Sequence, residues 1–169
     1  MKTLVVWYSN SGTTALVAER IARELGADLE SIAEVKARPR LVIDGQPSPE
    51  GGRAMPAASF AAMLGLGSAI CDCRMDPSQY DLVVIGTPVW VRALTPAVRS
   101  YLKRHRKSLP RVAFFCTGGE PEKARVFGQM RRLARKDPVA TLVVKSEDAR
   151  SDACSGAVEQ FVAQLKAAV

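Results

Sequence analysis

The stretch TLVVWYSNSGTTALVAERIARELG, residues 3–26, decides the fold. Residues 3–8 are apolar, β-branched or aromatic with no polar alternation, which is typical of a buried strand. Ser9–Gly12 then supply turn-forming side chains, and from Thr13 to Leu25 apolar residues recur at three- and four-residue spacing before Gly26. That spacing indicates an amphipathic helix with a glycine stop. The stretch therefore predicts a buried strand, a tight turn and a helix.

The rest of the chain continues this alternation. We predict strands at residues 28–35, 80–86, 111–116 and 139–145, and helices at residues 95–106, 121–136 and 152–168. Thr87-Pro88 is expected to end the strand at 80–86. Continuously apolar strands that alternate with helices indicate a parallel sheet covered on both faces. The prediction is one α/β domain over residues 1–169.

The segment from 36 to 79 departs from this pattern. It has no clear period and is rich in proline and glycine, with an alanine-rich piece at 57–66 that is predicted to be helical. A loop of this length inside a compact domain is functional or partly mobile. The sequence leaves open whether the segment forms a lid over a ligand or a surface for a partner.

The composition is that of a soluble globular protein. The chain has 169 residues, of which 47% are hydrophobic and 24% are charged, and its mean hydropathy is +0.00. It has no run of about 20 apolar residues that could span a bilayer, and its first residues lack the features of a signal peptide. We therefore expect a cytoplasmic protein without membrane insertion. The four cysteines predict reduced thiols and no metal site.

The net charge of +7 is concentrated in one stretch. Residues 92–136 hold 13 lysines and arginines against 2 glutamates, whereas the remainder of the chain has more acidic than basic residues. Such a stretch favours acidic or phosphorylated partners. His105, the only histidine, lies within the basic run 103–107 and is interpreted as a solvated side chain, neither a ligand nor a base.

Three turns follow predicted strands at the edge where parallel sheets bind ligands, the carboxyl ends of the strands. The first offers hydroxyls, an amide and a glycine directly before a helix: Ser9, Asn10, Ser11, Gly12, Thr13 and Thr14. The first turn of a helix has unpaired N–H groups and binds anions. Because this turn has no lysine or arginine, it favours a phosphate monoester over a nucleoside triphosphate or a dinucleotide. A plain helix cap is the alternative interpretation.

The second turn presents an aromatic side chain on a proline-stiffened segment, Thr87-Pro88-Val89-Trp90-Val91-Arg92. The indole of Trp90 is placed to stack on a planar ligand or, alternatively, to plug the end of the core. Arg92 is a candidate for binding a carboxylate or phosphate, with a surface salt bridge as the alternative. The third turn, Thr117-Gly118-Gly119-Glu120, has two glycines where a backbone would approach a ligand closely.

Together the three turns resemble the flavodoxin-like family of FMN-binding proteins. Ser9-x-Ser11-Gly12-x-Thr14 is similar to the phosphate loop of the family, residues 80–90 to its third strand and first flavin loop, and Thr117-Gly118-Gly119 to its second flavin loop. The resemblance covers essentially the whole chain. It implies a three-layer αβα sandwich around a five-stranded parallel sheet of order 2-1-3-4-5.

The resemblance also implies FMN as the cofactor. The phosphate would lie on residues 9–14, and the ring against Thr87, Pro88, Val89, Trp90, Val91 and Arg92 and against Thr117, Gly118, Gly119 and Glu120. The implied function is electron transfer, as a carrier or as a small NAD(P)H-dependent flavin or quinone reductase. No side chain is required as a catalytic acid, base or nucleophile, because the cofactor carries the electrons.

Two departures from the family bear on the partners. The chain is basic where carrier flavodoxins are acidic, and residues 117–125 contain no aromatic side chain to cover a second flavin face. We expect a redox partner protein or NAD(P)H, and the sequence leaves its identity open. Two alternatives from other classes are a flavin-free partner-binding domain and a basic nucleic-acid-binding module. No aromatic platform for specific nucleic acid recognition accompanies the basic helices, so we expect no such ligand.

Overall fold

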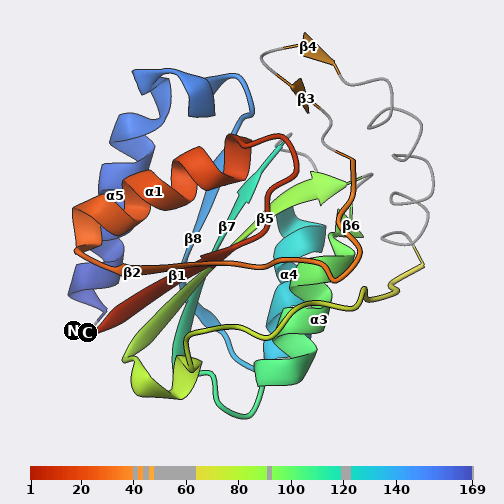
Figure 1. The fold of residues 1–169 in the computed structure, drawn as a ribbon. Helices are drawn as coiled ribbons and strands as arrows, with labels where there is room; N and C mark the ends of the chain where they lie inside the picture. The colour runs from red at the N-terminus through yellow and green to blue at the C-terminus, as the bar shows by residue number, and fades with distance from the viewer. Residues whose placement is uncertain (40–41, 44–45, 48–63, 91–92, 119–122, 169) are drawn as a thin grey trace.

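The computed structural model describes residues 1–39, 42–43, 46–47, 64–90, 93–118 and 123–168. Strands and helices alternate along this part of the chain (Figure 1). The strands are β1 (Thr3–Trp7), β2 (Asp28–Ser31), β3 (Val42–Ile43), β4 (Gln46–Pro47), β5 (Leu82–Trp90), β6 (Ala93–Leu94), β7 (Arg111–Thr117) and β8 (Pro138–Val144). The helices are α1 (Thr13–Leu25), α3 (Pro96–His105), α4 (Lys123–Ala134) and α5 (Ser155–Ala167), with short 3₁₀ helices at Pro77–Gln79, Asp148–Arg150 and Asp152–Cys154.

The parallel strands of the central sheet lie in the order β2-β1-β5-β7-β8. When only these parallel strands are counted along the chain, the order is 2-1-3-4-5, so the predicted topology is confirmed. A further short strand, β6, pairs antiparallel with the end of β5. The strand order reverses between β1 and β5, and doubly wound sheets bind their ligands at such a switch point.

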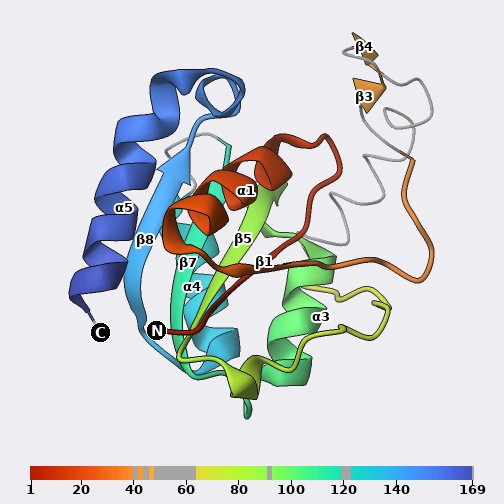
Figure 2. The ribbon, with the colours of Figure 1, turned by 60° about the vertical axis from the view of Figure 1, so that its left-hand side comes forward.

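Helices cover both faces of the sheet. α1 and α5 lie on one face and α3 and α4 on the other, as the two views show (Figures 1 and 2). Side chains of β5 alternate between the two layers, because Val83 and Ile85 pack with α3 and α4 whereas Leu82 and Val84 pack with α1 and α5. Both faces of the strand are therefore buried, which explains its continuous apolar sequence.

Helix α1 has the bounds that the sequence predicts, and it is flanked by two glycines in the left-handed conformation. Gly12 has φ 85° and Gly26 has φ 59°, a region in which a side chain is strained. The N–H of Ala27 donates to the carbonyl of Ala22 (2.9 Å), which closes the last turn of the helix. The chain therefore turns tightly between the end of β1 and the start of α1, at the carboxyl edge of the sheet.

β5 is longer than the sequence predicts. It continues through Thr87 and Pro88 to Trp90, so the prediction that Thr87-Pro88 ends this strand is wrong. β1 pairs with β5 only as far as Gly86, so Pro88 has no partner in β1. A proline, which has no N–H to donate to a neighbouring strand, is tolerated where such pairing has ended. The other edge of β5 still pairs with β7 up to Pro88 and Thr117.

Other predicted segments also differ from those observed. β2 ends at Ser31 and does not reach residue 35, and the helix predicted at 152–168 begins with a 3₁₀ turn before α5. β3 and β4 form an antiparallel pair within the segment 36–79, where no strand is predicted. The helix predicted at 57–66 lies mostly outside the described residues, and Leu64–Leu66 are not helical.

Gly86 accommodates the ring of Phe115 on the neighbouring strand. The two residues are register partners in β5 and β7, and a Cβ at position 86 would lie 2.0 Å from Cζ of Phe115. Phe115 is fully buried, so its ring has no free space into which it could move. Only glycine therefore allows this strand pair to close directly before the second turn.

His105 is partly buried in the structure, and the interpretation of it as a solvated residue is wrong. Its ring packs on that of Tyr101 with centroids 4.6 Å apart, and its Nε2 is buried without a hydrogen-bond partner among the described residues. Burial lowers the pKa of His105 below its ordinary value of 6.5, and the charge of Arg104 lowers it further. Protonation of this imidazole therefore favours the unfolded chain.

The stability of the fold is expected to fall as the pH drops through about 6.5, because the unfolded chain then binds a proton at His105 more readily than the folded chain does. The variant His105→Phe retains the ring contact and removes the titration. Its free energy of unfolding, measured in urea between about pH 7 and about pH 5, should decrease less than that of the unmodified chain. NMR titration of the single histidine at a pKa of 6.5 or above would contradict the assignment.

Candidate functional site

The first turn, Ser9–Gly12, connects β1 to α1 at the carboxyl edge of the sheet. Thr13 and Thr14, the first residues of α1, are buried, and the Thr13 hydroxyl lies 3.2 Å from that of Ser11. Among the described residues no side chain caps α1, although hydroxyl groups surround its first turn. The interpretation of these residues as a plain helix cap is therefore not what the structure has. The first N–H groups of α1 have no intrahelical acceptor and remain available to an anion.

Ser9 provides a second sign of an anion site. Its Oγ is buried and has no hydrogen-bond partner in the described part of the chain, which is costly for a hydroxyl. A phosphate oxygen would accept this hydrogen bond together with those of the first-turn N–H groups and the neighbouring hydroxyls. The donors of this turn are therefore suited to a phosphate group, and the turn itself contains no cation.

The third turn lies next to the first. The hydroxyls of Thr14 and Thr117 are 2.8 Å apart and both side chains are buried, although the two residues are 103 positions apart in the sequence. Gly118 follows with φ 147°, and its N–H donates to the carbonyl of Val144 at 3.0 Å. A side chain at position 118 would approach Val89 of the second turn, since a Cβ there would lie 3.1 Å from Cβ of Val89. The three predicted turns therefore meet at one edge of the sheet.

The hydrogen bond between Thr14 and Thr117 links two of these turns. Replacing Thr14 with valine leaves the buried hydroxyl of Thr117 without this partner and should lower the free energy of unfolding by about 1 kcal/mol. In the background Thr117→Val, the same replacement should cost less, with a coupling energy of about 1 kcal/mol in a double-mutant cycle measured by urea denaturation. Strictly additive costs would show that the two hydroxyls do not stabilise each other.

The second turn is mostly a continuation of β5. Thr87 is fully buried, and its hydroxyl donates to the carbonyl of Pro88 at 2.9 Å and lies 3.0 Å from that of Thr95. Pro88 and Val89 are half-buried at the edge of the sheet. Among the described residues of this turn, Pro88 and Val89 therefore retain exposed surface, whereas the side chain of Thr87 forms hydrogen bonds within the protein.

Trp90 lies in the core. Its side chain is only 4% exposed and belongs to the apolar cluster shared with α3 and α4, as the interpretation of Trp90 as a plug describes. The ring of Tyr8 contacts the indole edge-on, with centroids 5.7 Å apart, and the guanidinium of Arg38 lies 5.6 Å from the indole centroid. The indole therefore forms part of the wall beneath the candidate site.

A polar cluster beside Trp90 was not predicted from the sequence. The carboxylate of Glu34, whose side chain is 4% exposed, accepts hydrogen bonds from the hydroxyl of Tyr8 (2.9 Å) and from Nε of Arg38 (2.7 Å). Burial raises the pKa of Tyr8 far above its ordinary value, and the charge of Glu34 raises it further. The Tyr8 hydroxyl therefore stays protonated and donates a hydrogen bond to the carboxylate of Glu34. Nothing in the sequence marks this cluster, because it depends on how the chain returns after β2.

Four of the predicted site residues lie outside the described part of the chain: Val91, Arg92, Gly119 and Glu120. Within the described ranges, no helix is long and apolar enough to cross a bilayer. That part of the chain also brings no three His, Cys, Asp or Glu side chains together as ligands for a metal ion.

The fold and the site define a doubly wound α/β protein whose hydroxyl-rich first turn lies at the switch point of its sheet. The family model described as Flavodoxin matches residues 2–139. The chain therefore belongs to the flavodoxin family, whose cofactor is FMN, and the predicted resemblance is confirmed. No curated protein matches the sequence.

Solved structures with the same fold include a flavoprotein in complex with FMN from Lactobacillus acidophilus. It has a TM-score of 0.67 and 23% identity, and the match covers 91% of this chain and 98% of that one. Oxidised Flavodoxin 2 from Bacillus cereus has a TM-score of 0.57 and 14% identity, covering 98% of this chain and 99% of that one. Two-electron reduced flavodoxin from Megasphaera elsdenii has a TM-score of 0.54 and 14% identity, covering 95% and 98%.

Proposed function

We propose that this protein binds FMN at the edge of the sheet where the three turns meet and transfers electrons. The observation that supports this most strongly is the first turn, where the buried hydroxyl of Ser9 has no partner among the described residues and no described side chain caps α1. Buried polar groups in proteins are almost always hydrogen-bonded. A phosphate bound at this turn would supply the missing acceptor.

The phosphate of FMN would be held by residues 9–14 without a lysine or arginine. Hydroxyls and N–H groups donate to its oxygens, and the partial positive charge at the start of α1 favours its negative charge. The hydroxyls of Ser11 and Thr13 already lie 3.2 Å apart, so one donates to the other and the second proton remains free for the phosphate. Gly12, with φ 85°, lets the backbone turn around the phosphate without a side chain in the way.

The ring would lie against the second and third turns. Val89 and Gly118 line this region, and the absence of a side chain at Gly118 leaves its backbone accessible. The proposal extends to the other residues of these turns: Thr87, Pro88, Trp90, Val91, Arg92, Thr117, Gly119 and Glu120. Trp90 supports the ring from the core, held in place by Tyr8 and Arg38.

When bound, FMN supplies the capacity to accept and release electrons one or two at a time. The protein residues bind and orient it, and the apolar wall around Trp90 excludes water from one side of the ring. Tyr8 is not a proton donor in this chemistry, because its proton is committed to Glu34 and its pKa is raised by burial. The acceptor or donor of the electrons approaches from the open side of the site.

The test is to titrate the purified full-length chain with FMN and follow the quenching of flavin fluorescence. We expect saturable binding of one FMN per chain. The loaded protein, reduced anaerobically with dithionite, should then pass its electrons to ferricyanide, an anionic acceptor. A chain that leaves flavin fluorescence unchanged at every FMN concentration would reject the proposal.

An electron carrier and a reductase are two forms of this function. We propose that the basic residues select the redox partner in either form. The excess of cations over residues 92–136 favours an acidic redox protein or the phosphorylated nucleotide NADPH over NADH. Rapid consumption of NADPH by the FMN-loaded protein, with a quinone or free flavin as acceptor, would identify a reductase. Slow consumption together with fast electron transfer to a protein would identify a carrier. We further propose that the protein acts in the cytoplasm.

A further inference from the structure

A basic hollow lies at the end of α4, far from the three turns. Its volume is about 400 Å³ and it is lined by Gly128, Arg131, Arg132, Arg135, Lys136 and Asp137. α4 follows the third turn at the carboxyl edge of the sheet and ends before β8 begins at the opposite, amino-terminal edge. The hollow therefore belongs to the other end of the molecule and is separate from the proposed FMN site.

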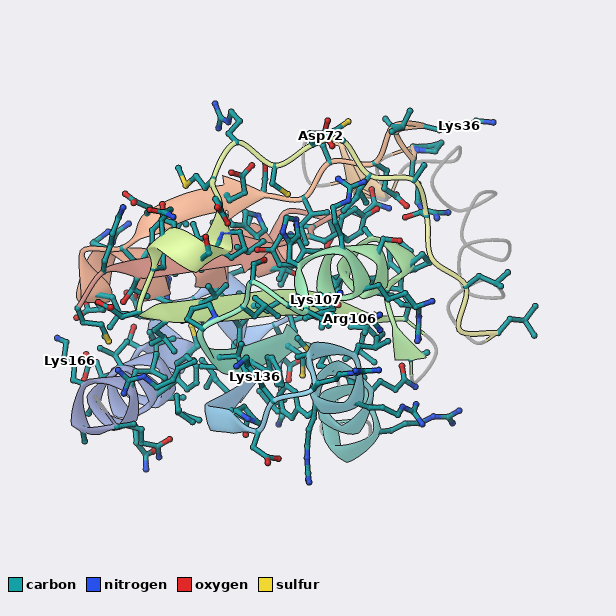
Figure 3. The ribbon with its side chains drawn as sticks, turned by 90° about the horizontal axis from the view of Figure 1, so that it is seen from below. Lys36, Asp72, Arg106, Lys107, Lys136 and Lys166 are labelled. Carbon is teal, nitrogen blue, oxygen red and sulfur yellow. The ribbon has the colours of Figure 1, made fainter. Side chains whose placement is uncertain are left out.

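The charge in this hollow is strongly unbalanced. Four cationic side chains surround it, all of them exposed, against the single carboxylate of Asp137. Asp137 forms an ion pair with Arg131, which leaves Arg132, Arg135 and Lys136 without a carboxylate partner in the lining. The residues that directly follow α3 add more positive charge to the same side of the molecule. Figure 3 shows Arg106 and Lys107 on this underside together with Lys136.

The backbone conformation of Arg135 is unfavourable for a residue with a side chain, which suggests a role for this side chain beyond the fold. Arg135 has φ 54°, and it is the only residue other than glycine with a positive φ in the described part of the chain. It follows the last residue of α4, where glycine is the residue that helices favour, and a side chain costs about 1 kcal/mol in this conformation. Arg131 and Arg132 complement the dipole of the last helical turn, but Arg135 and Lys136 lie beyond it.

We infer that this hollow binds a compact anion with two or more linked phosphoryl groups, such as a polyphosphate or the polyphosphate part of a nucleotide. Three guanidinium groups and one ammonium group match the dense charge of such an anion, and guanidinium groups bind phosphate oxygens through paired hydrogen bonds. The lining contains no aromatic side chain on which a base could stack, which disfavours single-stranded nucleic acid. Gly128 has open space around its Cα, so the anion can approach the helix backbone.

The experiment is a calorimetric titration of the full-length, FMN-saturated protein with inorganic tripolyphosphate, combined with NMR mapping of the amide shifts. We expect binding that weakens when NaCl is raised from about 50 mM to about 200 mM, because the contacts are electrostatic. The amide shifts should occur at residues 128–137. Binding of ATP with equal affinity would show that the hollow accepts a nucleotide polyphosphate, and weaker binding of ATP would identify inorganic polyphosphate.

The variant Arg135→Gly separates binding from folding. It removes one cation and also relieves the backbone at position 135, so its melting temperature should equal or exceed that of the unmodified chain while tripolyphosphate binds about tenfold more weakly. Lys166→Ala removes an exposed cation from the last turn of α5 and should leave the affinity unchanged. Three results would overturn the inference: no binding of tripolyphosphate, shifts confined to residues 9–14, or binding of an RNA oligonucleotide but not of tripolyphosphate. None of them depends on whether the protein transfers electrons.

Discussion

Replacing Ser11 with aspartate is expected to weaken the binding of FMN about 100-fold while leaving the protein folded. Ser11 is half-buried in the first turn, one residue before Gly12, which directly precedes α1. A carboxylate there would stand within a few ångströms of a phosphate that carries nearly two negative charges. At the effective dielectric constant of a partly buried site, this repulsion costs about 3 kcal/mol, which corresponds to about 100-fold in affinity.

The same charge should not harm the fold. A negative charge near the start of a helix interacts favourably with the helix dipole, so the melting temperature of Ser11→Asp without FMN should be equal to or above that of the unmodified chain. Ser11→Asn, which has a similar size and no charge, is the matched control and should bind FMN within about fivefold of the unmodified affinity. Fluorescence titration measures both variants. Equal affinities for the aspartate and asparagine variants would show that the phosphate binds elsewhere.

Replacing Gly86 with alanine is expected to lower the free energy of unfolding by about 3 kcal/mol, measured by urea denaturation of the chain without FMN. The added Cβ would lie 2.0 Å from the buried ring of Phe115, and the core around that ring has no room for it to shift without displacing its neighbours. FMN binding should weaken as well, since the strand pair leads directly into the second and third turns.

Gly128→Ala is the matched control for this change. Gly128 is an exposed residue in the interior of α4, and a Cβ at that position meets no atom within 4 Å. Alanine is the better helix former, so this variant should raise the free energy of unfolding by about 0.5–1 kcal/mol. If Gly86→Ala were as stable as the unmodified chain, β5 and β7 could not pack in the register described here.

The fold was predictable because its signals are local. The strand, turn and helix of residues 3–26 are encoded by periodicity within that stretch, and the bounds of α1 agree with it residue for residue. The continuously apolar strands are also a local signal, and they indicate a parallel sheet buried on both faces. The strand order 2-1-3-4-5 came from the resemblance to a family and not from this periodicity. The observed order confirms it.

The extension of β5 does not follow from the sequence, because the effect of a proline depends on the neighbouring strand. Proline breaks a strand that is paired on both sides, and the sequence does not reveal that the pairing of β5 with β1 stops at Gly86 while its pairing with β7 continues to Pro88. The consequence matters for the site, because Trp90 is then the last residue of a strand and its side chain is buried in the core. The candidate residues were identified from their types, but the orientation of each side chain depends on this tertiary pairing.

The cluster of Tyr8, Glu34 and Arg38 was beyond prediction for a related reason. Glu34 and Arg38 are four residues apart, which in a helix would be an ordinary surface pair. Here they lie in an irregular segment after β2, and the hydroxyl of Tyr8 reaches the same carboxylate from the end of β1. The partial burial of His105 is likewise not apparent from the sequence, because a run of cations surrounds a ring that contacts Tyr101 on the preceding helical turn.

The most direct test of the central claim compares FMN with riboflavin, which has the same ring but no phosphate. Equilibrium titrations of the full-length chain with each ligand measure how much the first turn contributes. If the hydroxyls of residues 9–14 and the start of α1 hold the phosphate, FMN should bind about 100-fold more tightly than riboflavin, or more. Equal affinities for the two flavins, or no binding of either, would contradict the account.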